Sequence, residues 1–236
     1  MSRAFEEIDH QPTPLGDISL RRRVEPTLQV DVYEVKLGDE FLMSSLFTVS
    51  EEAVARLGLA AALGDRLDVV IGGLGLGHTA KTALDDTRVV RLQVIDALPQ
   101  VIGWHRNHLV PLGAELTRDP RCTFVDGDFF AMVADGIEPG DDGPKRFDAI
   151  LVDIDHTPSH LLSSAHADFY RSAGLARVRD QLLPGGAFAL WSDDPPDDGF
   201  VAELDGVFAS VVAHVVAFAN FYTGDESACT VYVATS

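Results

Sequence analysis

The sequence predicts an α/β fold: a doubly wound, seven-stranded and mostly parallel sheet, preceded by a small β appendage. Two observations support this fold class. From residue 67 onward, short apolar runs typical of buried strands alternate with segments of helical pattern. The first run, residues 67–71, leads into four glycines within six positions, which is typical of a tight turn between a strand and a helix.

Length and composition fit one such domain with a small addition. The chain has 236 residues, and 46% of them are hydrophobic, which is enough for a full core. Its 37 acidic residues outnumber 18 Lys and Arg residues, which gives a net charge of −19. Because a surface this acidic repels phosphate groups, neither nucleic acid nor an anionic membrane is expected as a partner. A cationic small substrate is compatible with it, although most of the charge is expected simply to keep the protein soluble.

The β appendage is expected to occupy residues 1–49. Residues 1–16 are polar and contain proline, which predicts an irregular lead. Residues 18–24 and 28–37 are then expected to form the two strands of a hairpin, and the second run alternates polar and apolar residues as half-buried antiparallel strands do.

The main domain is expected to span residues 50–236 and to begin with a helix. Ser50 can cap this helix, and Glu51 and Glu52 favour its positive end. The expected strands lie at residues 67–71, 89–96, 122–126, 147–153, 187–191, 210–217 and 229–234. Further helices are expected at residues 98–108, 128–133, 167–183 and 198–208. Because no helix separates the last two strands, they should form an antiparallel hairpin at the edge of the sheet.

The glycine turn and an acid beyond it predict a nucleoside site. Gly73, Gly75 and Gly77 allow a ligand to approach the main chain, and the amides at the start of the next helix would face that ligand. Asp96 ends the second strand 19 residues after Gly77, where a carboxylate can accept hydrogen bonds from both ribose hydroxyls. An ordinary tight turn followed by an exposed Asp would give the same pattern.

The glycine spacing argues against a dinucleotide. A dinucleotide turn reads G-x-G-x-x-G, whereas the run from Gly73 reads G-x-G-x-G, with His78 in the sixth position. This shorter turn favours S-adenosylmethionine (AdoMet) over NAD or FAD. An NAD-linked oxidoreductase is therefore the weakest of the hypotheses.

Further candidates lie at the carboxyl ends of other strands, which is where doubly wound sheets bind their ligands. Asp153 ends the fourth strand, and its carboxylate could orient an ammonium and take its proton before attack on a sulfonium donor. It could equally cap the loop that follows. Asp155 and His156 lie in that loop and are further candidates for catalysis. His156 could transfer a proton because the ordinary pKa of histidine is near neutrality.

The segment after the fifth strand predicts a cation site. Trp191 and Asp193 could line it, through the face of the indole ring and the charge of the carboxylate. A solvated acidic loop is the alternative. His160 lies close to Asp155 and His156 in the sequence, but this spacing matches no common metal motif, and no metal is expected.

The order of elements resembles the Rossmann-like fold of class I AdoMet-dependent methyltransferases. Within that fold, most of the chain is similar to the spermidine synthase (polyamine aminopropyltransferase) family, and the β appendage is included. The matching stretches are residues 70–73, Asp96 with residues 101–102, residues 125–128 and residues 147–153. The resemblance implies that Asp96 holds the ribose and that Asp153 is the acid that activates the amine. It also implies that Asp128 receives the adenine amino group, with Phe129 beside the ring.

The chain departs from the family at three places. The Asp that grips the aminopropyl ammonium in the family's glycine turn corresponds here to Gly75. The family's D-S-S-D-P run is replaced by residues 153–158, and residues 41–45 stand where the appendage usually ends in Tyr-His-Glu. Two hypotheses follow. One is a transferase that moves an aminopropyl or methyl group from decarboxylated AdoMet or AdoMet to a small amine such as a polyamine. The other is a non-catalytic adenosine-binding or scaffold protein on the same fold.

The resemblance further implies a homodimer, and the cysteines favour the cytoplasm. Cys122 and Cys229 form neither a disulfide framework nor a zinc pattern, which fits a reducing compartment. The longest apolar run, around residues 207–221, is too short to span a bilayer and is expected to be a strand.

Overall fold

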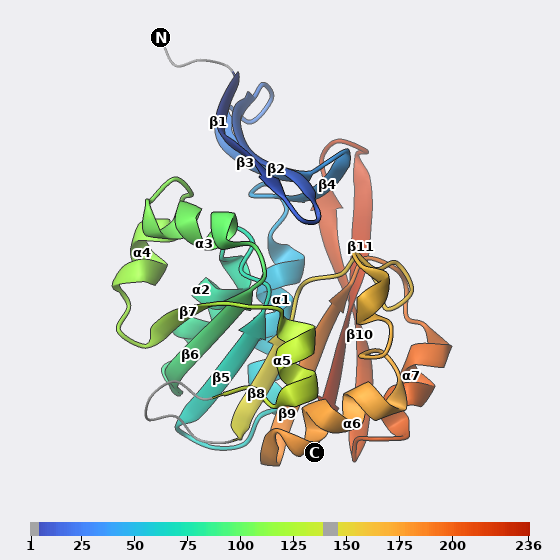
Figure 1. Cartoon of the computed structure of the whole chain (residues 1–236). Helices are drawn as coiled ribbons and strands as arrows, with labels where there is room; N and C mark the ends of the chain where they lie inside the picture. The colour runs from blue at the N-terminus through green and yellow to red at the C-terminus, as the bar shows by residue number, and fades with distance from the viewer. Residues whose placement is uncertain (1–4, 139–145) are drawn as a thin grey trace.

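The computed structural model describes residues 5–138 and 146–236, and most of them surround a seven-stranded sheet (Figure 1). The strands lie in the order β10-β11-β9-β8-β5-β6-β7. Their bounds are β5 Leu67–Gly72, β6 Val89–Asp96, β7 Cys122–Asp126, β8 Phe147–Val152, β9 Leu182–Ser192, β10 Ser210–Asn220 and β11 Asp225–Thr235. β11 runs antiparallel to β9 and β10, and the other neighbours are parallel. The predicted doubly wound sheet with an antiparallel hairpin at one edge is confirmed.

Helices cover both faces of this sheet (Figure 1). On one face lie α1 Val49–Ala61, α2 His78–Asp85, α3 Pro99–Arg106 and α4 Gly113–Arg118. On the other lie α5 Phe129–Asp135, α6 Ser172–Asp180 and α7 Asp198–Asp205, and a short 3-10 helix, Ser164–His166, precedes α6. Among the described residues, no helix has the length and apolar character needed to cross a membrane.

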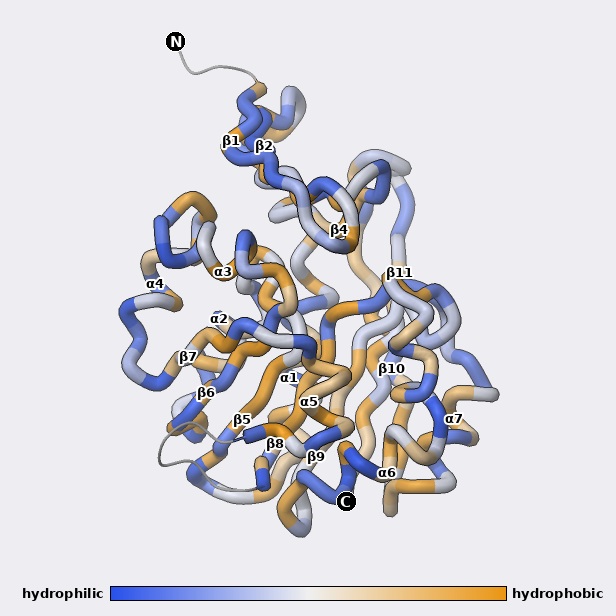
Figure 2. Tube along the Cα trace, viewed as in Figure 1, coloured by the Kyte–Doolittle hydropathy of each residue, from blue (hydrophilic) through white to orange (hydrophobic). Residues whose placement is uncertain are grey.

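Each face of the sheet buries its own apolar cluster, because successive side chains of a strand point to opposite faces. Leu151 of β8 and Ala189 of β9 are buried on the face covered by α1. Their neighbours Ile150 and Leu190 are buried on the face covered by α5, α6 and α7. The central strands β5 and β8 are covered on both sides, which accounts for their apolar sequence beyond the second residue of each (Figure 2).

The appendage is a four-stranded antiparallel sheet rather than a hairpin. Its strands are β1 Phe5–Thr13, β2 Gly16–Glu25, β3 Val30–Leu37 and β4 Glu40–Ser44. The irregular lead predicted over residues 1–16 is therefore wrong for the part that is described, and residues 1–4 lie outside the described residues. Ion pairs such as Arg22–Glu6, at 3.0 Å, join β1 to β2. A hydrophobic pattern does not reveal pairing of this kind.

Two predictions about helices are also corrected. The helix expected over residues 167–183 is only α6, because Arg171 at its N-cap is extended, with φ −100° and ψ 159°, and β9 already begins at Leu182. The Tyr170 hydroxyl, just before the helix, donates to Asp155 at 2.8 Å. Ser50 does not cap α1, because the helix already begins at Val49 and Thr48 occupies the N-cap position. The Ser50 hydroxyl donates instead to the carboxylate of Glu51, at 2.7 Å.

The four-stranded sheet lies over the carboxyl ends of the parallel strands (Figure 1). Met43 of β4 packs against the glycine turn, and its sulfur lies 2.6 Å from where a Cβ on Gly75 would be. The tip of the β10–β11 hairpin reaches the same sheet, where Arg23 donates to the Tyr222 hydroxyl at 3.0 Å. The appendage and this hairpin therefore border the region in which a doubly wound sheet binds its ligands.

We expect Gly73→Ala to destabilise the protein, because φ is +94° and a Cβ there would lie 2.1 Å from the backbone oxygen of Asp153. The left-handed backbone alone costs a non-glycine residue about 1–2 kcal/mol. Gly103→Ala in α3 is the matched control, because nothing lies within 4 Å of its Cβ. Urea denaturation should give a lower midpoint for Gly73→Ala and an unchanged or higher one for Gly103→Ala. Equal midpoints would contradict this packing.

Candidate functional site

The glycine turn joins β5 to α2 at the carboxyl edge of the sheet. Gly73, Gly75 and Gly77 all have positive φ angles, of 94°, 48° and 92°. The amide of Gly73 donates to the backbone oxygen of Ile95 at 2.9 Å, so the turn is tied to the neighbouring strand β6. The main chain here is therefore held in a conformation that residues other than glycine rarely adopt.

Asp96 fastens the turn from the end of β6. Its two carboxylate oxygens accept hydrogen bonds from the amides of Leu74, at 2.9 Å, and Leu98, at 2.8 Å. Burial raises the pKa of Asp96, and these amide hydrogen bonds oppose that rise. Each carboxylate oxygen has a further lone pair, so Asp96 can orient the turn and still accept a hydrogen bond from a hydroxyl.

The His105 side chain of α3 contacts the backbone of the turn, a role that the sequence did not suggest. The side chain is fully buried, and its Nε2 lies 2.9 Å from the backbone oxygen of Gly75. Burial lowers the pKa of His105 to about 4, so the ring is neutral near neutral pH. A neutral ring that bonds a carbonyl through Nε2 carries its proton there, so His105 donates to Gly75.

Asp153 follows β8 directly and is deeply set, although part of its surface stays open. Its amide donates to the backbone oxygen of Gly72 at 2.9 Å, and its Oδ2 accepts from the Thr79 hydroxyl at 2.8 Å. Burial raises the pKa of Asp153 to about 6, and the hydrogen bond from Thr79 opposes that rise. Asp153 is thus a carboxyl whose pKa lies near neutrality, at the end of a central strand.

A second carboxyl, Glu51 of α1, lies beside Asp153. The Thr79 hydroxyl links them, because it lies 3.2 Å from the backbone oxygen of Glu51 as well as 2.8 Å from Asp153. Burial and the charge of Asp153 raise the pKa of Glu51 to about 7. In the sequence this residue is an ordinary acid of a first helical turn, and only the tertiary packing of α1 against α2 brings it close to Asp153.

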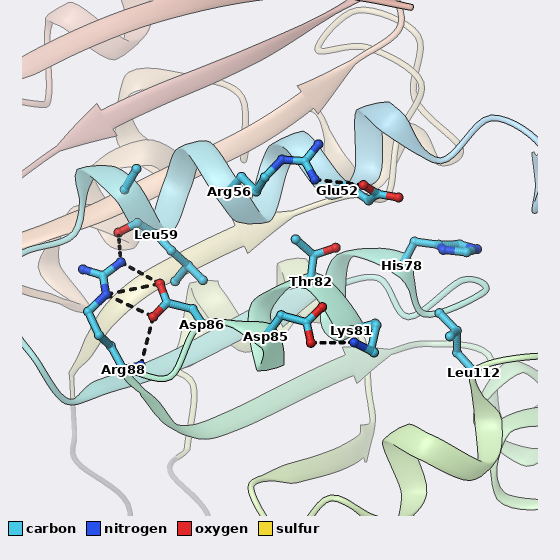
Figure 3. Close-up of a pocket in the computed structure, with 11 residues that line it drawn as sticks. Glu52, Arg56, Leu59, His78, Lys81, Thr82, Asp85, Asp86, Arg88 and Leu112 are labelled. Carbon is cyan, nitrogen blue, oxygen red and sulfur yellow. Dashed lines mark hydrogen bonds and ion pairs between the residues drawn. The ribbon is translucent and has the colours of Figure 1, made fainter.

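The basic side chains that α1 and α2 carry are engaged elsewhere. Arg56 pairs with Glu52 at 2.8 Å, and Lys81 pairs with Asp85 at 2.5 Å (Figure 3). These groups line a separate groove of about 540 Å³ between α1 and α2, together with His78, whose pKa is lowered by burial. Neither cation is therefore paired with the carboxyls of Glu51 and Asp153.

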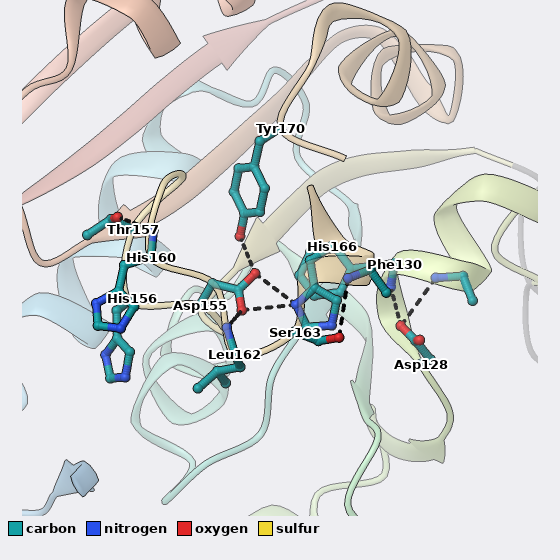
Figure 4. A network of polar contacts seen from close by, with 12 residues as sticks. Asp128, Phe130, Asp155, His156, Thr157, His160, Leu162, Ser163, His166 and Tyr170 are labelled. Carbon is teal, nitrogen blue, oxygen red and sulfur yellow. Dashed lines mark hydrogen bonds and ion pairs between the residues drawn. The ribbon is translucent and has the colours of Figure 1, made fainter. Parts of the chain in front are cut away.

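Asp155 holds the loop between β8 and α6 in place (Figure 4). It is 2% exposed and accepts hydrogen bonds from the Tyr170 hydroxyl at 2.8 Å and the Leu162 amide at 2.7 Å. The Nδ1 atom of His166 lies 3.0 Å from both carboxylate oxygens. These contacts hold the loop through the Asp155 carboxylate, and the catalytic role expected of Asp155 stays a prediction.

His156, Trp191 and Asp193 lie where two loops meet. The Asp193 amide donates to the backbone oxygen of His156 at 2.8 Å, which joins the loop after β8 to the loop after β9. The His156 ring faces the appendage, with Nε2 3.9 Å from a Glu40 carboxylate oxygen. Trp191 is half-buried on the α1 face of the sheet, and Asp193 is exposed. Within residues 5–138 and 146–236, no group of three or more His, Cys, Asp or Glu side chains is placed to hold a metal ion.

Asp128 and Phe129 lie between β7 and α5. Asp128 is exposed and caps α5, because its Oδ1 accepts from the amides of Phe130, at 2.9 Å, and Ala131, at 3.2 Å. Phe129 is 2% exposed, and its ring carbons lie 2.7–2.9 Å from where a Cβ on Gly72 would be. Phe129 therefore supports the glycine turn from the core. Its neighbour Phe130 lines a pocket of about 240 Å³ beside Asp128.

We expect Glu51→Gln to raise the thermal midpoint at about pH 8 and to leave it unchanged at about pH 4. The folded pKa values of Glu51 and Asp153, about 7 and about 6, lie above the ordinary values of 4.5 and 3.8. The folded state therefore binds more protons than the unfolded state in this window, so stability falls as the pH rises from about 4 to about 7. Removing one carboxyl should relieve most of this loss.

The matched control is Glu52→Gln, on the same helical turn. A hydrogen bond from Arg56 lowers the pKa of Glu52, so this group contributes stability above its ordinary pKa. Its replacement should not raise the midpoint at about pH 8. Scanning calorimetry at both pH values measures the two variants, and a lowered midpoint for Glu51→Gln at about pH 8 would argue against a buried carboxyl pair.

Comparison with known sequences finds distant relatives, although no protein-family model matches the chain. It is 27% identical over 112 residues to a polyamine aminopropyltransferase of Corynebacterium efficiens, across 48% of this chain and 20% of that protein. It is 26% identical over 164 residues to polyamine aminopropyltransferase 2 of Pseudomonas aeruginosa, across 65% of this chain and 43% of that protein. The matches therefore span less than half the length of either relative.

Comparison with solved structures extends the likeness to nearly the whole chain. The spermidine synthase of Thermotoga maritima aligns with a TM-score of 0.74 at 18% identity, over 97% of this chain and 72% of that one. A probable spermidine synthase of Corynebacterium glutamicum aligns with a TM-score of 0.67 at 16% identity, over 96% and 79%. Human methyltransferase-like protein 13, solved with SAH, aligns with a TM-score of 0.57 at 17% identity, over 78% and 81%. The resemblance predicted from the sequence is confirmed: the chain is similar to polyamine aminopropyltransferases and has the fold that spermidine synthases share with class I methyltransferases.

Proposed function

We propose that the chain is a spermidine synthase-like transferase. It binds an AdoMet-type sulfonium nucleoside at the glycine turn and transfers an aminopropyl group to a small amine, such as a polyamine. The observation that carries this proposal is Asp153: a deep carboxyl with a pKa raised to about 6, at the end of a central strand and beside the turn. A base with a pKa near the working pH suits proton transfer from an ammonium.

The nucleoside would lie along the turn between β5 and α2. Asp96 would accept hydrogen bonds from the ribose hydroxyls through its remaining lone pairs, because its bonds to Leu74 and Leu98 already fix its orientation. Asp128 would accept a hydrogen bond from the adenine amino group through Oδ2. Its Oδ1 caps α5, and the side chain is exposed. His105 would keep the Gly75 carbonyl from turning toward the ligand.

The chemistry is an in-line displacement at carbon. Asp153 first takes a proton from the acceptor ammonium, which leaves a neutral amine. The amine nitrogen then attacks the carbon of the aminopropyl chain that is bonded to sulfur, at a starting separation of about 3–3.5 Å. The new C–N bond forms as the C–S bond breaks, and the sulfur keeps the electron pair as a neutral thioether, methylthioadenosine.

Two other functions have specific support. Methyl transfer from AdoMet is favoured by the fold shared with methyltransferase-like protein 13. It would need a partner for the methionine carboxylate, and Lys81 is already paired with Asp85 and Glu115. A non-catalytic adenosine-binding protein is favoured by Gly75, which stands where the resembling family has an acid. Fold alone does not decide among these activities.

We extend the proposal to a homodimer in the cytoplasm. The dimer rests on analogy with spermidine synthases. The location is supported by Cys122 and Cys229, which are both free thiols.

We expect Asp153→Asn to abolish turnover and to preserve binding of methylthioadenosine. Turnover is measured as methylthioadenosine formed from decarboxylated AdoMet and a diamine, and it should fall by about 100-fold or more when the base is lost. Binding, measured by calorimetry, should be unchanged because Asp96 and the glycine turn are untouched. Asp205→Asn, an exposed residue at the end of α7, is the control. Full turnover by Asp153→Asn would dispose of this role. An unaltered protein that binds methylthioadenosine but turns over neither donor would favour the non-catalytic function.

A further inference from the structure

The strand β10 forms one edge of the seven-stranded sheet. All 11 of its residues pair with β11, from Ser210 opposite Thr235 to Asn220 opposite Asp225, and the register does not shift. Among the described residues, no strand pairs with the other side of β10. The N–H and C=O groups of every second residue are therefore directed outward, where they can pair with a strand of another chain.

The three other edge strands of the described residues carry features that oppose such pairing. β1 contains Glu6 and Pro12, and its register shifts against β2. β4 has 5 residues, begins at Glu40 and also shifts in register, and β7 has 5 residues and ends at Asp126. β10 has none of these features, because it is long and regular and residues 210–220 include no Asp, Glu, Lys, Arg, Pro or Gly.

Apolar side chains of β10 are exposed on both faces of the strand. Val212 is 47% exposed on one face, and Val215 is 61% exposed on the other. Val211 and Ala213 share the face of Val215 and pack against the apolar cluster that includes α7, but Val215 lies outside that cluster. An open backbone edge that also exposes apolar side chains indicates an interaction surface.

The sequence of β10 is complementary to a second copy of itself. If two β10 strands pair antiparallel about a two-fold axis at Val215, Ser210 of one copy faces Asn220 of the other, and Val212 faces Phe218. Polar ends then meet polar ends, and a β-branched side chain meets an aromatic one, which is a stabilising cross-strand pair. Both faces of the strand keep their side in this arrangement, as a two-fold interface requires.

The charge of the protein also favours this surface for contact between two copies. Each chain has a net charge of −19, so two copies repel each other over most of their surfaces. Because β10 has no acidic or basic side chain, the pairing of two such strands places no carboxylates opposite one another. The strand offers no charge that would select a basic or acidic partner of another kind.

We propose that β10 is an interaction surface, which pairs antiparallel with β10 of a second copy of this chain about a two-fold axis at Val215. The seven-stranded sheets of the two copies are then continuous across the interface. The inference gives the homodimer proposed above a specific interface. It does not depend on the transferase activity.

The pairing also reaches the border of the candidate site. Near the end of β10, the Phe218 ring lies 5.9 Å from the ring of Phe47, which follows the appendage. Beyond the end of the strand, the Tyr222 hydroxyl accepts the hydrogen bond from Arg23 of β2. A second copy that holds β10 therefore also holds the tip of the hairpin against the appendage.

Sedimentation velocity of the intact protein and of variants at Val215 tests the proposal. The unaltered protein should be a dimer. Val215→Lys and Val215→Glu should each raise the dissociation constant of the dimer roughly tenfold or more, because like charges then lie directly opposite each other. An equimolar mixture of the two variants should recover dimers, because a Lys of one copy then faces a Glu of the other. That recovery also shows that both variants are folded.

Two variants serve as matched controls and should remain dimers. Val215→Thr keeps a β-branched side chain without a charge, and Leu63→Lys places the same charge on another exposed apolar residue, which is 70% exposed. A monomeric unaltered protein would overturn both the homodimer and this interface. If dimers persist in both charged variants, or if their mixture stays monomeric, the pairing of β10 is overturned and the homodimer needs another surface. Turnover and nucleoside binding are measured separately, so the proposed activity stands or falls on its own.

Discussion

The close approach of the glycine turn to the end of β8 is the constraint on which the candidate site depends. Gly73 lies so near the Asp153 backbone that a Cβ would come within 2.1 Å of its oxygen. Because of this contact, β5 and β8 can end side by side. The helix α2 then begins at a place where the Thr79 hydroxyl reaches the Asp153 carboxylate. Asp96 then fixes the turn from β6. Three neighbouring strands thus deliver their terminal residues to one place.

The acidic pair at this place is costly for folding. Burial raises the pKa of Glu51 and of Asp153, so each carboxylate is less stable there than in water. The chain has a net charge of −19, which adds long-range repulsion. A cationic ligand would relieve both effects. Functional sites often retain such unfavourable groups at a cost in stability.

The sequence predicted most of the fold, and it pointed to some members of the candidate site but not to others, for physical reasons that differ between residues. Alternation of apolar strands with helices is a local pattern, so the order of the parallel strands followed from it. Asp96 and Asp153 end strands and could be recognised by position alone. Glu51 and His105 could not, because their roles arise from the packing of α1 against α2 and of α3 beneath the turn. The sequence could not show the contacts of Asp155 either, since only the fold brings Tyr170 and His166 to its carboxylate.

The most direct test of the central claim is a crystal structure of the protein with decarboxylated AdoMet. The account predicts that the adenosine lies along Gly73–Gly77, with the ribose hydroxyls hydrogen-bonded to Asp96 and the aminopropyl chain directed toward Asp153. A nucleoside bound elsewhere, such as in the groove between α1 and α2, would contradict it. So would an aminopropyl chain that points away from Asp153.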